Sequence, residues 1–332
     1  MDLLKRIIFF LIFIIPVLFL TLGPDFRVEP KTPKWTIGVL AASSAKAEKI
    51  AGFRRGLRDL GFVEGQNISY TFLNAQGQRE KLLPLARQLV AKKPDVLVAT
   101  GGVEADALKK ATVAEEIPIV FIGSASSVER GLVKSFLQPG THITGVDNFH
   151  AELAGKRLEL LKKLLPSVHR VAVLYDPEVP PGYQSLKIVR ETAGKLGMEI
   201  GTIEISSREE LKAKLNPQTL QGFDAVLPLS SFLFEAISHD LLALSLKNHL
   251  PVMAVYGQEA DTGFLAAYGV SMDNQGYQGA RLVAKVLYGQ QPEQIPVETP
   301  DNLELLVNLR TAKQLGLRLN ETALSFAKVI ID

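Results

Sequence analysis

The sequence contains no cysteine. Disulfide bonds, thiolate metal ligands, cysteine nucleophiles and lipid attachment at a cysteine are therefore all excluded. An excess of one charge is lacking too, since 37 basic residues stand against 35 acidic ones and the formal net charge is +2. Because these charges are scattered along the chain, the electrostatic footprint of a nucleic-acid-binding protein is missing, and we expect no nucleic-acid partner.

The sequence also lacks the common motifs of catalysis and cofactor binding. It contains no Gly-x-Ser-x-Gly elbow, no Gly-Lys-Ser/Thr phosphate loop and no Gly-x-Gly-x-x-Gly dinucleotide motif. The histidines show no tight metal-ligand spacing; they are His142, His150, His169, His239 and His249. We therefore predict that the protein is not an enzyme, that it has no catalytic residues, and that it holds no cofactor and no metal.

The N-terminus has the pattern of an export signal. Lys5 and Arg6 precede an uncharged apolar run from Ile7 to Gly23, which is the order of a charged n-region and an apolar h-region. The only small-residue site for cleavage ends at Gly23, and Pro24 follows it directly. Because proline after the cut obstructs signal peptidase, we expect the segment to stay attached as a membrane anchor.

Residues 1–26 are therefore assigned to a signal or anchor segment and residues 27–34, rich in proline, to an extended linker. We expect the protein in the periplasm or at the outer face of the cytoplasmic membrane, held there by the N-terminal helix. Secretion after signal cleavage is the alternative.

From Trp35 onward, short apolar runs alternate with amphipathic helical stretches. A chain of 332 residues exceeds the usual size of one hydrophobic core, so two domains are expected. Runs rich in Val, Ile and Leu without polar alternation indicate parallel strands buried on both faces. They lie at residues 37–41, 68–73, 95–99, 117–122, 171–175, 198–205, 225–229, 251–255 and 264–268. The fold class is therefore α/β, with two doubly wound parallel-sheet lobes joined by a hinge.

A break near Gly145 to His150 separates the two predicted lobes. Lobe 1 covers residues 35–147, and a helix in a return segment of about 271–292 should pack on it. Lobe 2 covers residues 148–270 together with a C-terminal segment of about 293–332.

Ligands of open α/β sheets bind beyond the carboxyl ends of the strands, so the loops that follow the strands are the candidate site. These loops are small and rich in hydroxyl groups. We predict ligand contacts from Ser43, Ser44, Gly101, Gly102, Gly123, Ser124, Ser126, Asp176, Tyr183, Gln184, Ser230, Ser231, Tyr256 and Gly257. Helix capping and tight turns are sufficient to explain any one of these loops alone. Six such loops facing two lobes favour a cleft.

The predicted second-lobe loops also carry tyrosines. Tyr175, Tyr183 and Tyr256 fall in or beside them, and an aromatic wall suits a flat or apolar ligand body. The serines and glycines of lobe 1 offer no fixed positive charge, and they would then bind a carboxylate or carbonyl through neutral donors and helix N-termini.

Several stretches resemble one family. Leu60–Ile68 reads LGFVEGQNI and Asn74–Gly77 reads NAQG, similar to the "LGYVEGKNV…NAQGD" signature of ABC-type substrate-binding proteins with the type I periplasmic-binding fold. Further matches follow in the family's order to the C-terminus; they are Ile117–Phe121, Gly131–Val133, Thr144–Val146, Val173–Tyr175, Ala267–Val270, Ile295–Glu298 and Val307–Lys313.

This resemblance implies uptake of an aromatic amino acid or related solute, with ABC permease and ATPase subunits as partners. Three positions depart from members that resemble amino-acid binders. Ser126–Ser127 replaces an Asp-Pro pair, Asp176 stands where Asn is frequent, and Val255–Gly257 replaces an acidic Ser-Asp-Glu loop. We therefore expect an extracytoplasmic solute-binding protein. A membrane-anchored ligand sensor of the same fold and a doubly wound α/β enzyme are the alternatives.

Overall fold

The computed structural model describes residues 34–331. The predicted signal or anchor segment lies outside these residues. Among the helices of residues 34–331, none is long and apolar enough to cross a membrane.

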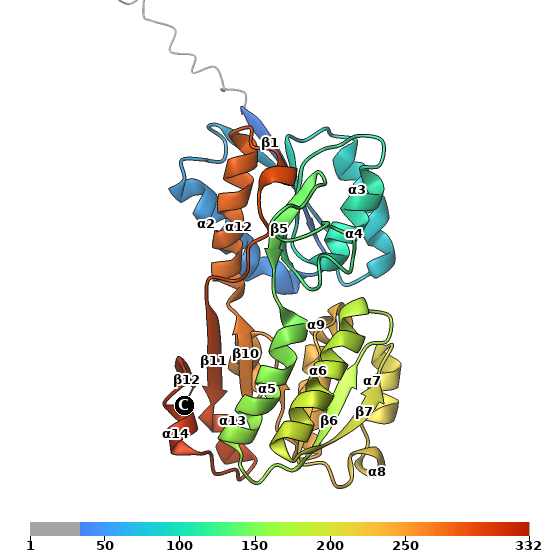
Figure 1. Ribbon diagram of the computed structural model, residues 1–332, viewed down its shortest axis with the longest axis vertical. Coiled ribbons are helices and arrows are strands. Elements are labelled where there is room, and N and C mark those ends of the chain that lie inside the picture. The colour runs from blue at the N-terminus through green and yellow to red at the C-terminus, as the bar shows by residue number, and fades with distance from the viewer. Residues whose placement is uncertain (1–33, 332) are drawn as a thin grey trace, which may run out of the picture. The chain divides into compact units, whose positions relative to one another are not determined.

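The first sheet has five parallel strands in the order β2-β1-β3-β4-β5 (Figure 1). Most of its strand residues are buried on both faces, which is why they appear in the sequence as continuous apolar runs. The strands are β1 (Trp35–Ala41), β2 (Ile68–Asn74), β3 (Val96–Ala99), β4 (Ile119–Ser124) and β5 (Ile143–Asp147). The connecting helices are η1 (Ser44–Lys46), α2 (Ala47–Asp59), η2 (Arg79–Lys81), α3 (Leu82–Val90) and α4 (Gly102–Ala111).

The second half of the chain forms two further sheets joined by a bridge between Val226 and Val252. One has the parallel order β7-β6-β8, from β6 (Arg170–Tyr175), β7 (Glu199–Glu204) and β8 (Ala225–Pro228). The other has the order β12-β11-β10-β9, from β9 (Met253–Ala254), β10 (Ala266–Val270), β11 (Leu303–Asn308) and β12 (Val329–Ile331). The α/β class with parallel sheets is confirmed, although β11 runs antiparallel to β10.

Helices cover the sheets of the second half (Figure 1). They are α5 (His150–Leu164), α6 (Pro180–Leu196), α7 (Arg208–Lys214), α8 (Pro217–Leu220), α9 (Phe232–Ala236), α10 (Ser238–Lys247), α11 (Gly257–Thr262), α13 (Leu309–Gln314) and α14 (Glu321–Leu324). The amphipathic pattern of residues 231–248 predicts one helix, but this prediction is wrong, since Ile237 leaves helical geometry and divides the segment into α9 and α10.

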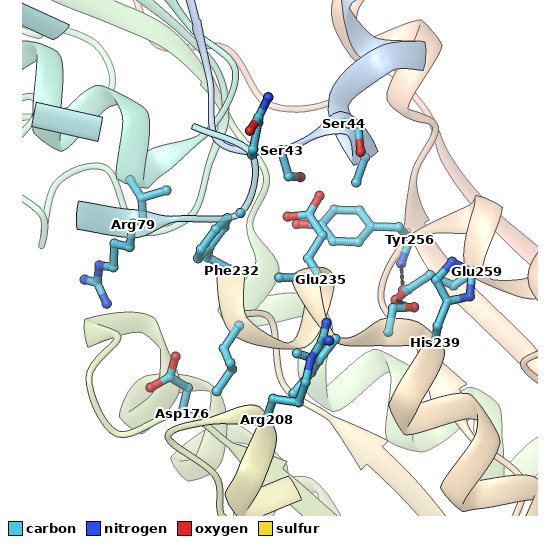
Figure 2. A pocket seen from close by; sticks show the side chains of 18 of the residues that line it. Ser43, Ser44, Arg79, Asp176, Arg208, Phe232, Glu235, His239, Tyr256 and Glu259 are labelled. Carbon is cyan, nitrogen blue, oxygen red and sulfur yellow. Dashed lines mark hydrogen bonds between the residues drawn. The ribbon is translucent and has the colours of Figure 1, made fainter. Parts of the chain in front are cut away.

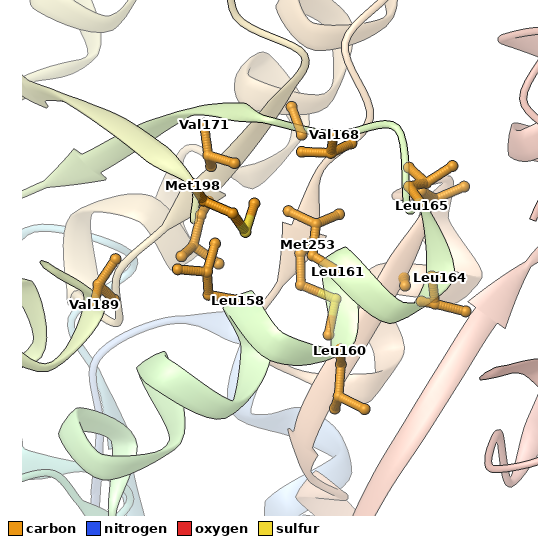
Figure 3. Close-up of a cluster of buried hydrophobic side chains, with 14 of the residues drawn as sticks. Leu158, Leu160, Leu161, Leu164, Leu165, Val168, Val171, Val189, Met198 and Met253 are labelled. Carbon is orange, nitrogen blue, oxygen red and sulfur yellow. The ribbon is translucent and has the colours of Figure 1, made fainter. Parts of the chain in front are cut away.

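Each half has its own hydrophobic cores. In the second half, Leu158 and Leu161 of α5 pack with Val171 of β6 and Met253 of β9 (Figure 3). Burial of a side chain of this size stabilises the fold by about 1.5–3 kcal/mol. In the first half, the apolar faces of α2 and α12 cover one side of the sheet, and those of α3 and α4 cover the other.

Helix α12 (Met272–Leu287) returns to the first sheet and packs along α2. The two helices meet backbone to backbone: a Cβ atom added at Gly276 would lie 1.9 Å from the main-chain oxygen of Lys49. After η3 (Pro292–Gln294), Ile295 and Val297 still belong to the first-sheet cores, whereas β11 joins the second half. The chain therefore passes from the first half to the second between residues 298 and 303, later than the residue 293 predicted from the sequence.

Candidate ligand-binding cleft

A cleft of about 1610 Å³ opens where the carboxyl ends of parallel strands from both halves face each other (Figure 2). Its walls consist of the loops and helix starts that follow these strands, which is the usual ligand position in open α/β sheets. The lining residues are Ser43, Ser44, Ala45, Ala47 and Glu48 after β1, Asn74, Gln76, Gly77, Arg79 and Glu80 at and after the end of β2, Asp176, Glu178 and Val179 after β6, residues 206–209 after β7, Phe232, Leu233 and residues 235–239 after β8, and Tyr256, Gln258, Glu259, Asp261 and Thr262 after β9, together with Val103 of α4.

A smaller inner cavity of about 50 Å³ adjoins the cleft. The two share wall residues, namely Val103, Val179, Phe232, Glu235 and Tyr256. One ligand molecule can therefore place a small group in the inner cavity while its larger part lies in the cleft.

The structure brings most of the predicted site residues to these two cavities. Ser43, Ser44, Asp176 and Tyr256 line the cleft. Gly101, Gly102, Gly123, Ser230 and Ser231 line the inner cavity, together with Tyr256. The first-half loops and the second-half loops thus face one another as the sequence predicted, while ligand contact by each residue stays a prediction.

Five predicted residues line neither cavity: Ser124, Ser126, Tyr183, Gln184 and Gly257. Ser124 is buried and donates to the carbonyl of Ala125. Tyr183 lies on α6, is 59% exposed and packs its ring near Tyr175. Of the three tyrosines proposed as an aromatic wall, Tyr256 lines the cleft, and Phe232 is an aromatic wall residue that the sequence reasoning missed.

An ion pair joins the two halves at the boundary between the cavities. Lys46 Nζ, from η1, lies 2.5 Å and 2.7 Å from the two carboxylate oxygens of Glu235 in α9. The two side chains are only 6% and 9% exposed. Burial alone would lower the pKa of Lys46, but Glu235, with help from Tyr256 and Glu104, outweighs burial and raises it. The ammonium group is therefore charged at any physiological pH.

A second buried polar group stands beside this pair, on α4. Glu104 Oε1 accepts hydrogen bonds of 2.8 Å from the backbone N–H of Ala42 and from Thr100 Oγ1. Its other oxygen, Oε2, has no hydrogen-bond partner in the part of the chain that the structure describes. Lys49 Nζ donates instead to the carbonyls of Thr100 and Ile122, at 2.9 Å each. Burial, followed by the charge of Lys46, lowers the pKa of Lys49.

Tyr256 is held from two sides. Its ring meets the His150 ring edge-on at 5.2 Å, and Glu259 Oε2 accepts from the backbone N–H groups of Val255 and Tyr256. Burial, and then the charge of Arg157, keeps the pKa of His150 well below its usual value. Burial raises the pKa of Glu259 to about 7. A neutral imidazole therefore packs against the ring that lines the cleft.

The sequence reasoning missed the charged residues Lys46, Glu104 and Glu235. Each lies within one helical turn of a strand-end loop that had been chosen. Extending each predicted loop by one turn into the following helix would have found them. The described residues contain no group of three or more His, Asp or Glu side chains that could hold a metal ion.

Comparison with known proteins gives concordant results. A model of the family described as "ABC transporter substrate binding protein" matches residues 36–331. The chain is 29% identical over 274 residues to a "Tyrosine-binding protein" of Clostridioides difficile, covering 82% of this chain and 77% of that protein.

Solved structures resemble the fold over 90% of this chain. One is a domain from Streptococcus pneumonia in complex with L-Trp, with a TM-score of 0.83, 23% identity and full coverage of that chain. Another is a conserved domain protein from Vibrio cholerae, with a TM-score of 0.83, 25% identity and 99% coverage. A third is the ligand-free, open structure of a substrate binding protein with adhesive properties from Clostridium difficile, with a TM-score of 0.69, 26% identity and 99% coverage of that chain.

Proposed function

Since this chain belongs to the family of ABC transporter substrate-binding proteins, we propose that it captures a small molecule outside the cytoplasm and delivers it to an ABC permease with its ATPase. The observation that carries the proposal is the cleft itself. Loops of both halves converge on it, and the ion pairs Lys46–Glu235 and Arg79–Glu178 already join the two halves there.

The two halves would act as lobes of a clamp, with the division near residue 148 and the returning helix α12 as predicted from the sequence. The chain superposes with a higher TM-score on the L-Trp complex than on the ligand-free, open structure. This difference supports the interpretation that the arrangement described here is the closed one.

We propose that the ligand has an aromatic body. Tyr256 and Phe232 line both the cleft and the inner cavity, and a ring stacked between aromatic side chains gains about 0.5–1.5 kcal/mol beyond burial. The names of the similar proteins, one tyrosine-binding and one solved with L-Trp, agree with a ligand of this kind.

We propose that residues 1–26 stay attached and anchor the protein in the cytoplasmic membrane. Intact-mass measurement of the exported protein tests this point, because a mature chain that begins between Gly23 and Trp35 would contradict it.

The test of the binding function starts with mass spectrometry of small molecules released from the purified protein. A thermal-shift screen and small-angle scattering follow, with aromatic amino acids and their amines as probes. A ligand at a hundredfold excess over its Kd stabilises the folded state by about 2.7 kcal/mol, so Tm should rise while the radius of gyration falls. If no probe raises Tm and no small molecule is released, the proposed function is wrong.

A further inference from the structure

The basic side chains that line the two cavities are already neutralised by the chain itself. Lys46 pairs with Glu235 at 2.5 Å, and Arg130 with Asp106 at 2.6 Å. Arg208 pairs with Asp240 at 3.1 Å, and Arg79 with Glu178 at 3.4 Å. No other lysine or arginine within residues 34–331 lines either cavity. A ligand carboxylate would therefore find no free cation there.

The acidic side chains show the opposite pattern. Glu48, Glu80, Glu209 and Asp261 line the cleft, and none of them forms an ion pair with another described residue. Uncompensated charge of one sign in a cleft concentrates solutes of the other sign. The cleft is therefore suited to a cation.

Asp176 adds a buried carboxylate to the second-half wall. It is 6% exposed, and its Oδ1 accepts one hydrogen bond of 3.0 Å from the backbone N–H of Glu178. Burial raises the pKa of Asp176, with the charge of Glu178 adding to it. The charge of Arg79 opposes this rise, but the Arg79 side chain is 51% exposed and is already paired with Glu178.

The free oxygen of Glu104 is the most specific of these features. The residue is 1% exposed, lines the inner cavity, and its Oε2 has no hydrogen-bond partner within the described residues. An unpaired buried acceptor costs about 1–3 kcal/mol, and more when it is charged. Lys46 and Lys49 are close enough to act on Glu104 through space, but the hydrogen bonds that they donate go to Glu235 and to main-chain carbonyls. A donor for Oε2 is therefore missing from the protein side.

Gly101 leaves the space beside this buried oxygen free of a side chain. A Cβ atom at position 101 would lie 2.8 Å from Glu104 Oε2, within the wall of the same cavity. The cavity of about 50 Å³ is large enough for an ammonium group, because a group the size of one water molecule needs only about 10–15 Å³ of such space.

We propose that the ligand is an aromatic amine with a net positive charge and no carboxylate, whose ammonium group donates a hydrogen bond to Glu104 Oε2 from within the inner cavity. Its ring would lie in the cleft against Phe232 and Tyr256, which line both spaces. This inference rests on the proposed function and narrows its ligand from aromatic solutes in general to cationic ones.

The test is calorimetric titration of the full chain with matched compounds. Tyramine, tyrosine and 3-(4-hydroxyphenyl)propionate share one ring and differ in the ammonium and carboxylate groups, and tryptamine and tryptophan form a second pair. We expect each amine to bind at least tenfold more tightly than its amino acid, and the propionate not to bind.

Two variants test the site. Glu104→Gln keeps the shape and removes the charge, and Gly101→Ala keeps the charge and blocks Oε2; each should weaken amine binding at least tenfold. Glu115→Gln, at an exposed residue outside both cavities, should leave binding unchanged. If Glu104→Gln fails to fold, Gly101→Ala gives the answer alone.

Tyrosine or tryptophan binding as tightly as its amine would overturn the inference and leave the proposed function intact. Full amine affinity in folded Glu104→Gln or Gly101→Ala protein would also overturn it. Failure of all five compounds to bind would overturn the inference together with the proposed aromatic ligand.

Discussion

Replacing Glu235 by glutamine removes the carboxylate from the ion pair that joins the two walls of the cleft. Lys46 is then left as an ammonium group that is 6% exposed and has lost its charged partner. Removal of one partner from a buried ion pair costs about 3–5 kcal/mol. Both Lys46–Glu235 contacts are short, at 2.5 Å and 2.7 Å, so the free energy of unfolding should fall within this range.

Two further variants isolate the pair itself. Lys46→Met alone leaves a buried carboxylate and should cost a similar amount, whereas Lys46→Met with Glu235→Gln leaves no unpaired charge. The double variant should therefore recover stability, with a coupling energy of at least about 1.5 kcal/mol. A matched control is the exposed pair Lys156–Glu159, at 3.0 Å and 43% and 40% exposure, for which about 0.2–1 kcal/mol is expected.

Urea denaturation of the four proteins gives the coupling energy, and small-angle scattering shows whether the single variants open the cleft. Opening would appear as a larger radius of gyration in Glu235→Gln and in Lys46→Met. The conclusion that this ion pair holds the walls together is refuted if the losses in free energy of unfolding at Lys46 and Glu235 are strictly additive and no greater than those of the exposed control pair.

Three further predictions concern other parts of the molecule. Gly276→Ala should lower Tm, because the added Cβ would lie 1.9 Å from the main-chain oxygen of Lys49. The control Gly194→Ala on α6, where a Cβ would meet nothing within 4 Å, should raise the free energy of unfolding by about 0.5–1 kcal/mol. Equal Tm values for the two variants would contradict the packing of α2 on α12. The pKa of His150 is lowered in the folded protein, so below about pH 6.5 the unfolded chain binds a proton at this histidine and the folded chain does not. As the pH falls further, the free energy of unfolding should therefore decrease by up to about 1.4 kcal/mol per pH unit. In denaturation curves measured from pH 8 to 5, the His150→Gln protein should not show this decrease. If the unmodified protein and His150→Gln have parallel pH profiles, His150 is not its cause. Phe232→Ala should weaken binding of an identified aromatic ligand about tenfold by calorimetry; unchanged affinity would place the ring elsewhere.

Much of the fold could be predicted from the sequence because both faces of its parallel strands are buried. The run at 96–99 is fully buried in the structure, and such runs leave a continuous apolar signal. Residues 303–308 were not predicted as a strand, since Leu303 is exposed and Glu304 only partly buried. Their antiparallel pairing with β10 depends on the arrangement of distant segments, which periodicity does not encode.

The candidate site was predictable as a set of loops and not as a set of charges. Ser43 and Asp176 were found because they directly follow strands. The pairing of Lys46 with Glu235 joins residues 189 positions apart, so nothing local distinguishes these side chains from charges on a solvated helix face. Tyr183 lies outside both cavities and is 59% exposed, since the direction of a side chain on α6 depends on how the helix packs.

The return of α12 to the first sheet also sets the order in which the molecule can be completed. Ala280, Leu282 and Val283 belong to the same core as Ile37 and Val39, although the second-half elements from α5 to β10 lie between them in the sequence. A chain emerging from the ribosome or from an export channel therefore cannot finish the core that begins at its own start until residue 287 has followed. The first sheet would wait with one apolar face uncovered, and a chain truncated before residue 272 would lose both halves of the molecule rather than one.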